Sequence, residues 1–171
     1  MSTEPEPAAG PEKEAATALV GREAFLEALR ALAGTAHLNI ALLSHALDAR
    51  VYGDAAFVET IQKFALRDPR CRLRVLVNAP EQTMRQGHRL VELGRRLSSR
   101  LHFRQLPEDQ KGVVEEYLVI DEKALLHRDA PDRLEARHYP YAPMAARRQL
   151  KIFEALWEES LPAREFSELR I

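Results

Sequence analysis

The strongest structural signal in the chain is Leu38-Asn39-Ile40-Ala41-Leu42-Leu43, a short and nearly continuous apolar run. Such a run is typical of a strand that is covered on both faces of a sheet. A second run, Leu73-Arg74-Val75-Leu76-Val77, has the same character. Between the two, an amphipathic helix is predicted to start at Asp54, its N-cap, and to end before Asp68-Pro69. Strand, helix and strand at this spacing predict a parallel βαβ unit.

Further elements are predicted on both sides of this unit. Apolar periodicity indicates helices over residues 19–33, from Pro80 to about Ser99, and from Pro143 to Leu161. Short apolar or alternating runs indicate strands at 101–104 and 134–139 and a hairpin over 117–126. The predicted fold class is therefore α/β, with a mixed, mainly parallel sheet and helices on both faces.

Composition indicates one soluble globular domain: the chain has 171 residues, of which 46% are hydrophobic and 30% charged, and its formal net charge is −1. Residues 1–18 differ from the rest, with three prolines, and one lysine against four glutamates. We expect them to form a disordered acidic tail and residues 19–171 to form the domain. The domain then carries a net charge of +2, which is too small to indicate nucleic-acid binding by itself.

Several classes of site are disfavoured by the sequence. Cys71 is the only cysteine, so no intramolecular disulfide and no cysteine-rich zinc site is expected. No histidine pair has metal-ligand spacing and no glycine-rich loop for a nucleotide follows a strand, so no metal and no cofactor is predicted. No apolar run has the length of a membrane span and the N-terminus lacks the pattern of a signal peptide, so a cytoplasmic protein is expected.

The order of elements resembles one half of a phospholipase D superfamily protein. The resemblance rests on Val119-Ile120-Asp121 at the end of a strand, on the hairpin that follows, and on a closing helix with Phe153 and Trp157. Four stretches are more closely similar to an uncharacterised bacterial family of phospholipase D-like domains. They are Leu47-Asp48, Gly87-His88-Arg89-Leu90, Tyr117-Leu118-Val119-Ile120-Asp121 and Phe153-Glu154-Ala155-Leu156-Trp157.

The resemblance implies a test of activity, because active members carry the motif His-x-Lys-x4-Asp. In that superfamily the His attacks phosphorus and the Lys holds the phosphate oxygens. If Asp121 is the Asp of the motif, Val114 stands at the His position and Glu116 at the Lys position. Both catalytic roles are therefore missing, and we expect a pseudoenzyme without catalytic residues.

A second stretch of the sequence has the spacing of the His-x-Lys-x4-Asp motif. His102-x-Arg104 followed by Asp109 reproduces it with Arg in place of Lys, but Pro107 interrupts the segment. We therefore interpret His102 as an edge-strand histidine. Cys71 lies among arginines that alternate along a strand, so we interpret it as a small buried residue without a redox role.

A pocket is expected at the rim of the sheet, where open α/β sheets place their binding loops. The residues predicted to meet there are Ser44, His45, Asn78, Asp121, His138 and Tyr139. The convergence of His45, Asp121 and His138 is the critical part of this prediction.

A basic stripe is predicted on the third helix, from Arg85, Arg89, Arg96 and Arg100. These side chains could contact phosphates, although a solvated helix face is the commoner explanation for such a stripe.

The sequence thus favours a catalytically inactive phospholipase D-like domain that binds a protein partner or a phosphorylated ligand. Two alternatives stay open. One is a phosphodiesterase, nuclease or phospholipase, that uses non-standard residues such as His45, His102 or His138, and the other is a nucleic-acid-binding module that uses the arginine stripe. A homodimer is also expected, because a single half exposes the surface that two-half relatives bury.

Overall fold

A computed structural model of the chain describes residues 14–83, 87–133 and 135–167. It contains one eight-stranded sheet with the order β1-β7-β6-β5-β2-β3-β4-β8. The strands are β1 Thr17–Val20, β2 Asn39–Ser44, β3 Arg72–Val77, β4 Leu101–Gln105, β5 Glu116–Ile120, β6 Ala124–Arg128, β7 Glu135–Tyr139 and β8 Leu161–Pro162. The helices are α1 Arg22–Gly34, α2 Ala49–Tyr52, α3 Ala55–Arg67, α4 Pro80–Thr83, α5 Arg89–Arg96, α6 Pro143–Glu159 and α7 Arg164–Ser167, with a 3-10 turn η2 at Glu108–Gln110.

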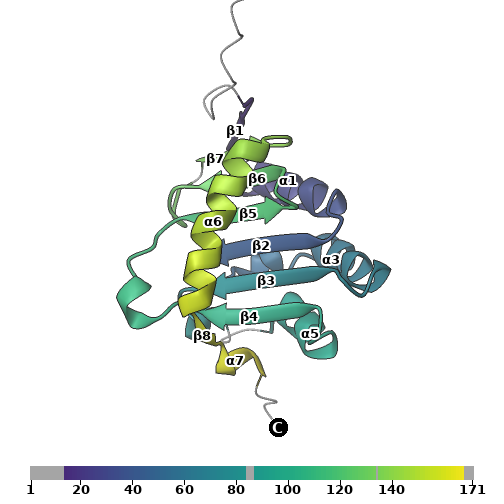
Figure 1. Cartoon of the computed structure of the whole chain (residues 1–171), viewed down its shortest axis with the longest axis vertical. Helices are drawn as coiled ribbons and strands as arrows, with labels where there is room; N and C mark the ends of the chain where they lie inside the picture. The colour runs from purple at the N-terminus through teal and green to yellow at the C-terminus, as the bar shows by residue number, and fades with distance from the viewer. Residues whose placement is uncertain (1–13, 84–86, 134, 168–171) are drawn as a thin grey trace, which may run out of the picture.

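Helices cover the sheet unequally. On one face lie α1, α3 and α5, and the long helix α6 crosses the other face (Figure 1). Each face has its own apolar core: the first includes Leu29, Phe57 and Ile61, and the second is built around Phe153 of α6. The strands of the centre are buried on both faces, which explains their continuous apolar runs.

The predicted fold class is confirmed, since the sheet is mixed and helices cover both faces. Parallel pairing is confined to β2 with β3 and β3 with β4, whereas the other five strand pairs are antiparallel. The parallel part is therefore smaller than the sequence predicted. The reason is that β5, β6 and β7 follow one another through short connections, which favour antiparallel neighbours.

The hairpin is confirmed and its turn has a specific geometry. Asp121 and Glu122 have φ angles of 48° and 59°, as a type I′ turn requires. The pairing Ile120 with Ala124 sets the register that places Glu116 directly opposite Arg128.

The expected tail boundary at residue 18 is wrong. Residues Thr17–Val20 form β1, an edge strand that pairs antiparallel with β7. The carboxylate of Glu14 accepts hydrogen bonds from the backbone N–H groups of Met144 and Ala145, at 2.8 and 2.9 Å, and so caps the start of α6. Composition missed these contacts because a strand edge and a helix cap need backbone and one carboxylate, not apolar residues. Residues 1–13 of the predicted tail lie outside the described residues.

The helix predicted after Pro80 is two separate helices. A short α4 ends at Thr83, and α5 begins at Arg89. His88 is the N-cap of α5, where its Nδ1 accepts a hydrogen bond from the N–H of Leu90 at 3.2 Å.

Asp54 joins the first two long helices. Its carboxylate accepts the N–H of Phe57 as the N-cap of α3, and it accepts two hydrogen bonds from Arg30 of α1, at 2.8 and 2.6 Å. The Arg30 guanidinium holds the pKa of this carboxyl well below its ordinary value, at about 2.

We predict that Asp54→Ala lowers the free energy of unfolding by about 1–2 kcal/mol at neutral pH, because a helix cap and an ion pair are lost. The lowered pKa means that the stabilisation is complete above the unfolded-state pKa and is lost as pH falls through the folded value of about 2. Urea denaturation from pH 7 to pH 2 should therefore show wild type and variant converging at the acid end. A constant difference over that range would contradict the assignment.

Candidate binding cavity

A cavity of about 700 Å³ opens at the carboxyl end of β2. It is walled by the residues that follow β2, by α2, by the start of α1 and by the loop after β6. Ser44, His45, Glu116 and Arg128 lie in its wall. This is the position where open α/β sheets place binding sites, and the volume is that of a small-molecule pocket.

Glu116 is the centre of a buried polar network in this wall. The residue is 3% exposed, and its Oε1 accepts hydrogen bonds from the hydroxyls of Ser44 and Tyr52, at 2.7 and 2.8 Å. Its other oxygen, Oε2, forms a salt bridge with Arg128 from the facing strand. A buried carboxylate is tolerated only when it is paired and hydrogen-bonded, and these three donors meet that requirement.

The partners of Glu116 are themselves held in place. The Ser44 hydroxyl accepts the N–H of Leu47 at 2.9 Å, and the Arg128 guanidinium lies 4.7 Å from the centre of the Phe25 ring. Burial, together with the adjacent Glu116 carboxylate, raises the pKa of the Tyr52 phenol well above its ordinary value. Tyr52 therefore stays protonated and acts as a donor to Glu116 at any physiological pH.

Further charges surround the mouth of the cavity. Asp48 pairs with Arg50 at 3.0 Å, and these hydrogen bonds lower the Asp48 pKa, although burial acts to raise it. Arg22 and Arg133 also line the cavity, and neither forms an ion pair within the described part of the chain. Within the described residues the mouth thus presents two arginines without a salt bridge, although Arg22 is close enough to Asp48 to help lower the pKa of that carboxyl, and Asp132 also lines the cavity.

Three of the six residues predicted to meet at the rim of the sheet do not lie at the end where the cavity opens. Ser44, His45 and Asn78 are at the same sheet end, where the Asn78 N–H donates to the carbonyls of Ser44 and His45, both at 3.1 Å. Asp121 is at the opposite end, because β5 runs antiparallel to β2 and pairs Ile120 with Ile40. The expected convergence of His45, Asp121 and His138 is therefore wrong.

Asp121 has a structural role at that opposite end. Its carboxylate accepts the backbone N–H groups of His37, Leu38 and Asn39, at 2.5, 2.8 and 2.7 Å. These bonds fix the entry into β2.

Tyr139, the last residue of β7, lies toward the same end as Asp121, whereas His138 lies level with the middle of β6. Tyr139 pairs with Leu125, one residue from the start of β6, and His138 pairs with Leu126 at the centre of β6, so neither residue reaches His45 at the carboxyl end of β2. Burial lowers the His138 pKa, and its Nε2 has no hydrogen-bond partner among the described residues.

The predicted arginine stripe is not a single helix face. Arg89 and Arg96 lie on α5, but Arg100 lies beyond its end and donates to the carbonyl of Ala65 at 2.6 Å. Arg85 lies outside the described residues. The prediction of one continuous stripe is therefore wrong, because the helix begins later and ends earlier than the periodicity indicated.

The remaining sequence predictions concern single residues. Cys71 is fully buried, as expected for a small core residue. His102 lies on β4, and one ring nitrogen is 3.2 Å from the Ser99 carbonyl. Among the described residues, no group of three His, Cys, Asp or Glu side chains is arranged to hold a metal ion. None of the helices in the described ranges is long and apolar enough to cross a bilayer.

Sequence reasoning missed Arg128 and Tyr52 as members of the site. Arg128 could have been found, since a turn at residues 121–123 places it opposite Glu116, and a buried acid there needs a cation. Tyr52 reaches the site from α2, and no sequence pattern relates it to Glu116.

A family model described as a domain of unknown function, DUF7931, matches residues 21–169. The chain belongs to the DUF7931 family. Comparison with curated protein sequences finds no match.

Solved structures identify the fold of this DUF7931 domain as phospholipase D-like. Nuc from Salmonella typhimurium, a phospholipase D family member, is 11% identical with a TM-score of 0.60, and the match covers 86% of this chain and 97% of that one. Phosphatidylserine synthase from Haemophilus influenzae is 11% identical with a TM-score of 0.60, over 91% of this chain and 41% of the synthase. TrmBL2, an archaeal chromatin protein, is 12% identical with a TM-score of 0.59, over 89% of this chain and 55% of that protein. The domain thus spans about half the length of the last two.

We predict that Glu116→Ala lowers the free energy of unfolding of the DUF7931 domain by about 3–5 kcal/mol, because it leaves the Arg128 charge buried without a partner. Glu115→Ala is the matched control: the adjacent carboxylate is 44% exposed and lies 3.4 Å from His127. Glu115→Ala should lower the free energy of unfolding by less than about 1 kcal/mol. Urea denaturation measures both values, and equal losses would contradict the central role of Glu116.

Proposed function

We propose that this domain is a binding module in which the phosphodiester chemistry of the phospholipase D superfamily has been lost. The observation that carries the proposal is the buried Glu116 and its network. The resemblance assigns this position to the phosphate-holding lysine, and a carboxylate there repels a phosphodiester. Arg128 does not replace the lysine, because its guanidinium is committed to Glu116.

The position of the nucleophile supports the same proposal. Val114 stands in place of the histidine, and its side chain is 56% exposed. His45 is the one histidine among the described residues that line the cavity. Its imidazole has no side-chain hydrogen-bond partner within the described ranges, whereas a histidine that acts as nucleophile or base is normally oriented by a second group.

The charges at the cavity mouth favour a phosphorylated ligand over a cationic one. Arg22 and Arg133 both line the cavity, and residues 131–133, which follow β6, are exposed. Guanidinium groups recognise phosphate through paired, charge-assisted hydrogen bonds. In this proposal the two arginines bind the phosphate at the mouth while Glu116 excludes it from the former catalytic position.

One compound, bis-(p-nitrophenyl) phosphate, tests binding and chemistry together. Calorimetry should detect its binding, and absorbance should detect no nitrophenolate release beyond the uncatalysed rate. The variant Arg22→Gln/Arg133→Gln should weaken binding about tenfold, as expected for loss of a charge-assisted contact. Arg147→Gln, a change at an exposed arginine of α6, should leave the affinity unchanged.

Turnover would overturn the proposal if it survives extensive purification and disappears in His45→Ala or His102→Ala. That result would establish the phosphodiesterase alternative. Binding of DNA that falls steeply as salt rises, without cleavage, would instead favour the nucleic-acid alternative, for which TrmBL2 offers only a shared fold.

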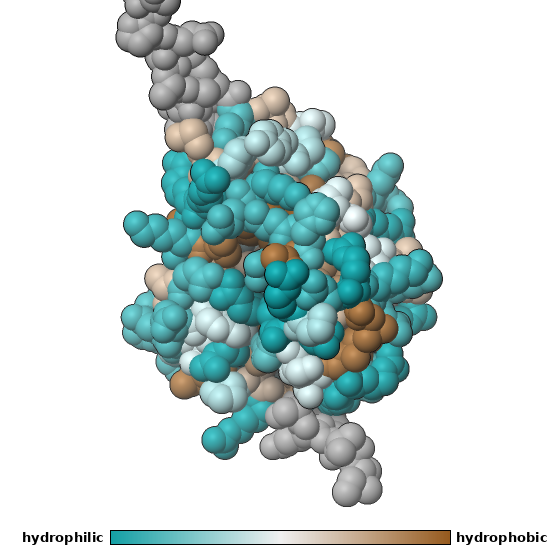
Figure 2. All heavy atoms as spheres, turned by 45° about the vertical axis from the view of Figure 1, so that its right-hand side comes forward, coloured by the Kyte–Doolittle hydropathy of each residue, from teal (hydrophilic) through white to brown (hydrophobic). Residues whose placement is uncertain are grey.

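We further propose a homodimer formed through the face that α6 covers. Among the described elements α6 is the only long helix on this face, and it exposes Met144 and Ile152, at 46% and 47%, with Leu161 following at 48%. Figure 2, which is turned by 45° from the view of Figure 1, shows a surface that is mostly hydrophilic, with apolar residues in small separated groups. The apolar residues of α6 therefore mark the side on which a second copy would pack.

Light scattering after size exclusion tests the dimer over a hundredfold range of concentration. We expect a mass near twice 19.4 kDa for the wild type and a shift toward the monomer for Ile152→Glu. A matched exposed apolar position on the other side, Leu66→Glu, should leave the mass unchanged. A monomeric wild type at every concentration would refute homodimerisation and favour a different protein partner.

A further inference from the structure

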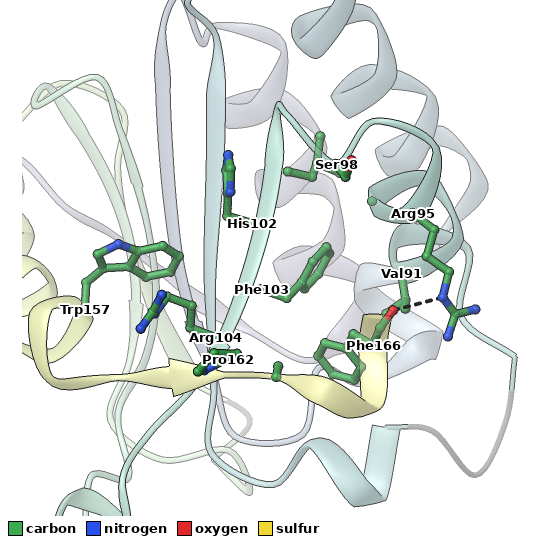
Figure 3. A pocket seen from close by; sticks show the side chains of 12 residues that line it. Val91, Arg95, Ser98, His102, Phe103, Arg104, Trp157, Pro162 and Phe166 are labelled. Carbon is green, nitrogen blue, oxygen red and sulfur yellow. Dashed lines mark hydrogen bonds between the residues drawn. The ribbon is translucent and has the colours of Figure 1, made fainter. Parts of the chain in front are cut away.

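A second hollow, separate from the cavity at β2, lies at the edge of the sheet formed by β4 and β8. Its volume is about 430 Å³, and it lies between α5, β4, β8 and α7 (Figure 3). No aspartate or glutamate is among the described residues that line it, whereas Arg95, Arg104 and His102 are. We call it the β4 groove.

The β4 groove extends over both sides of strand β4. The consecutive residues 101–104 all line it, although alternate side chains of a strand point to opposite faces. This is possible because β8 pairs with only the last two residues of β4, Arg104 and Gln105. Figure 3 shows Trp157 and Arg104 on one side of the strand and Phe103, Phe166 and Val91 on the other.

One side of the groove is an apolar surface. The Phe103 and Phe166 rings meet edge to face, with centroids 5.4 Å apart. Gly94 of α5 makes this packing possible, because a Cβ at that position would come within 2.3 Å of the Phe103 ring. The aromatic surface is therefore built into the packing of β4 against α5 and α7.

The other side presents an arginine whose charge is not neutralised. The Arg104 guanidinium donates from Nε to the Ser160 hydroxyl and from Nη2 to the Ser160 carbonyl, both at 2.5 Å. It also stacks on Trp157, at 5.5 Å from the ring centre. Within the described residues it has no carboxylate partner, and its Nη1 makes no hydrogen bond. Arg74 of the neighbouring strand β3, on the same face of the sheet, differs in this respect, because Glu154 pairs with it at 2.6 Å.

We propose that the β4 groove binds a small amphipathic carboxylate. The apolar body of the ligand packs against Phe103 and Phe166, and its carboxylate pairs with Arg104. The Ser160 contacts and the Trp157 ring fix the guanidinium before the ligand arrives, which reduces the entropic cost of binding. The volume and the mixture of apolar lining with a few polar groups are those of small-molecule sites. This site does not depend on the function proposed for the cavity at β2.

Trp157 provides the measurement, since it is the only tryptophan of the chain and it contacts Arg104. Titration of the full chain with octanoate should change the Trp157 fluorescence saturably, and calorimetry should give the same affinity. 1-Octanol has the same chain length without the charge, and it should bind at least tenfold more weakly. Arg104→Gln should weaken octanoate binding at least tenfold and leave octanol binding nearly unchanged.

Arg74→Gln is the matched control for Trp157. Arg74 also lies 5.5 Å from the Trp157 ring, but it does not line the groove. This variant should alter the starting fluorescence and keep the octanoate affinity within twofold. The proposal is overturned if wild type shows no octanoate binding by either method, if octanol binds as well as octanoate, or if Arg104→Gln and Arg74→Gln behave alike.

Discussion

The buried pair of Glu116 and Arg128 is the interaction on which the centre of this domain depends. Removing a carboxylate from water is costly, so each of its oxygens must be matched by donors from other elements. Ser44 supplies one from the end of β2, Tyr52 another from α2, and Arg128 the third from β6. The requirements of one side chain therefore hold together the strands and the short helix that form the cavity wall.

The same pair links the stability of the domain to its proposed function. In the superfamily resemblance, this position belongs to a lysine that attracts phosphate, and the surrounding groups would then be free to serve a substrate. In this domain the surrounding groups donate hydrogen bonds to Glu116, and the Glu116 carboxylate, not a ligand, orients Arg128. Recovering phosphate chemistry at this point would require replacing the whole network, because a lysine beside Arg128 would create a buried like-charge pair. In the proposed function, Arg22 and Arg133 at the mouth bind the ligand instead.

Arg74 of β3 and Arg104 of β4 show how an ion pair within the domain decides whether an arginine is available to bind an anion. Arg74 and Arg104 both stack on Trp157, at 5.5 Å, so the aromatic contact does not distinguish them. Glu154 neutralises Arg74, whereas Arg104 is held by the neutral groups of Ser160. A cation fixed by neutral donors and aromatic contact retains its attraction for an anion, and that difference separates a structural ion pair from a candidate binding group.

The sequence by itself determined the elements whose signals are local. The apolar runs of β2 and β3, the Asp54 cap, the hairpin and the helix that starts at Pro143 all depend on residues close together in the chain, and all are present. Tertiary structure alone decided which residues share a site. Asp121 and His138 were expected beside His45, but antiparallel pairing carries β5 and β7 away from that end, and strand direction leaves no mark in apolar periodicity. Likewise Glu14, Tyr52 and Arg104 obtain their roles from partners that are 130, 64 and 56 positions away, a relation that only the folded chain creates.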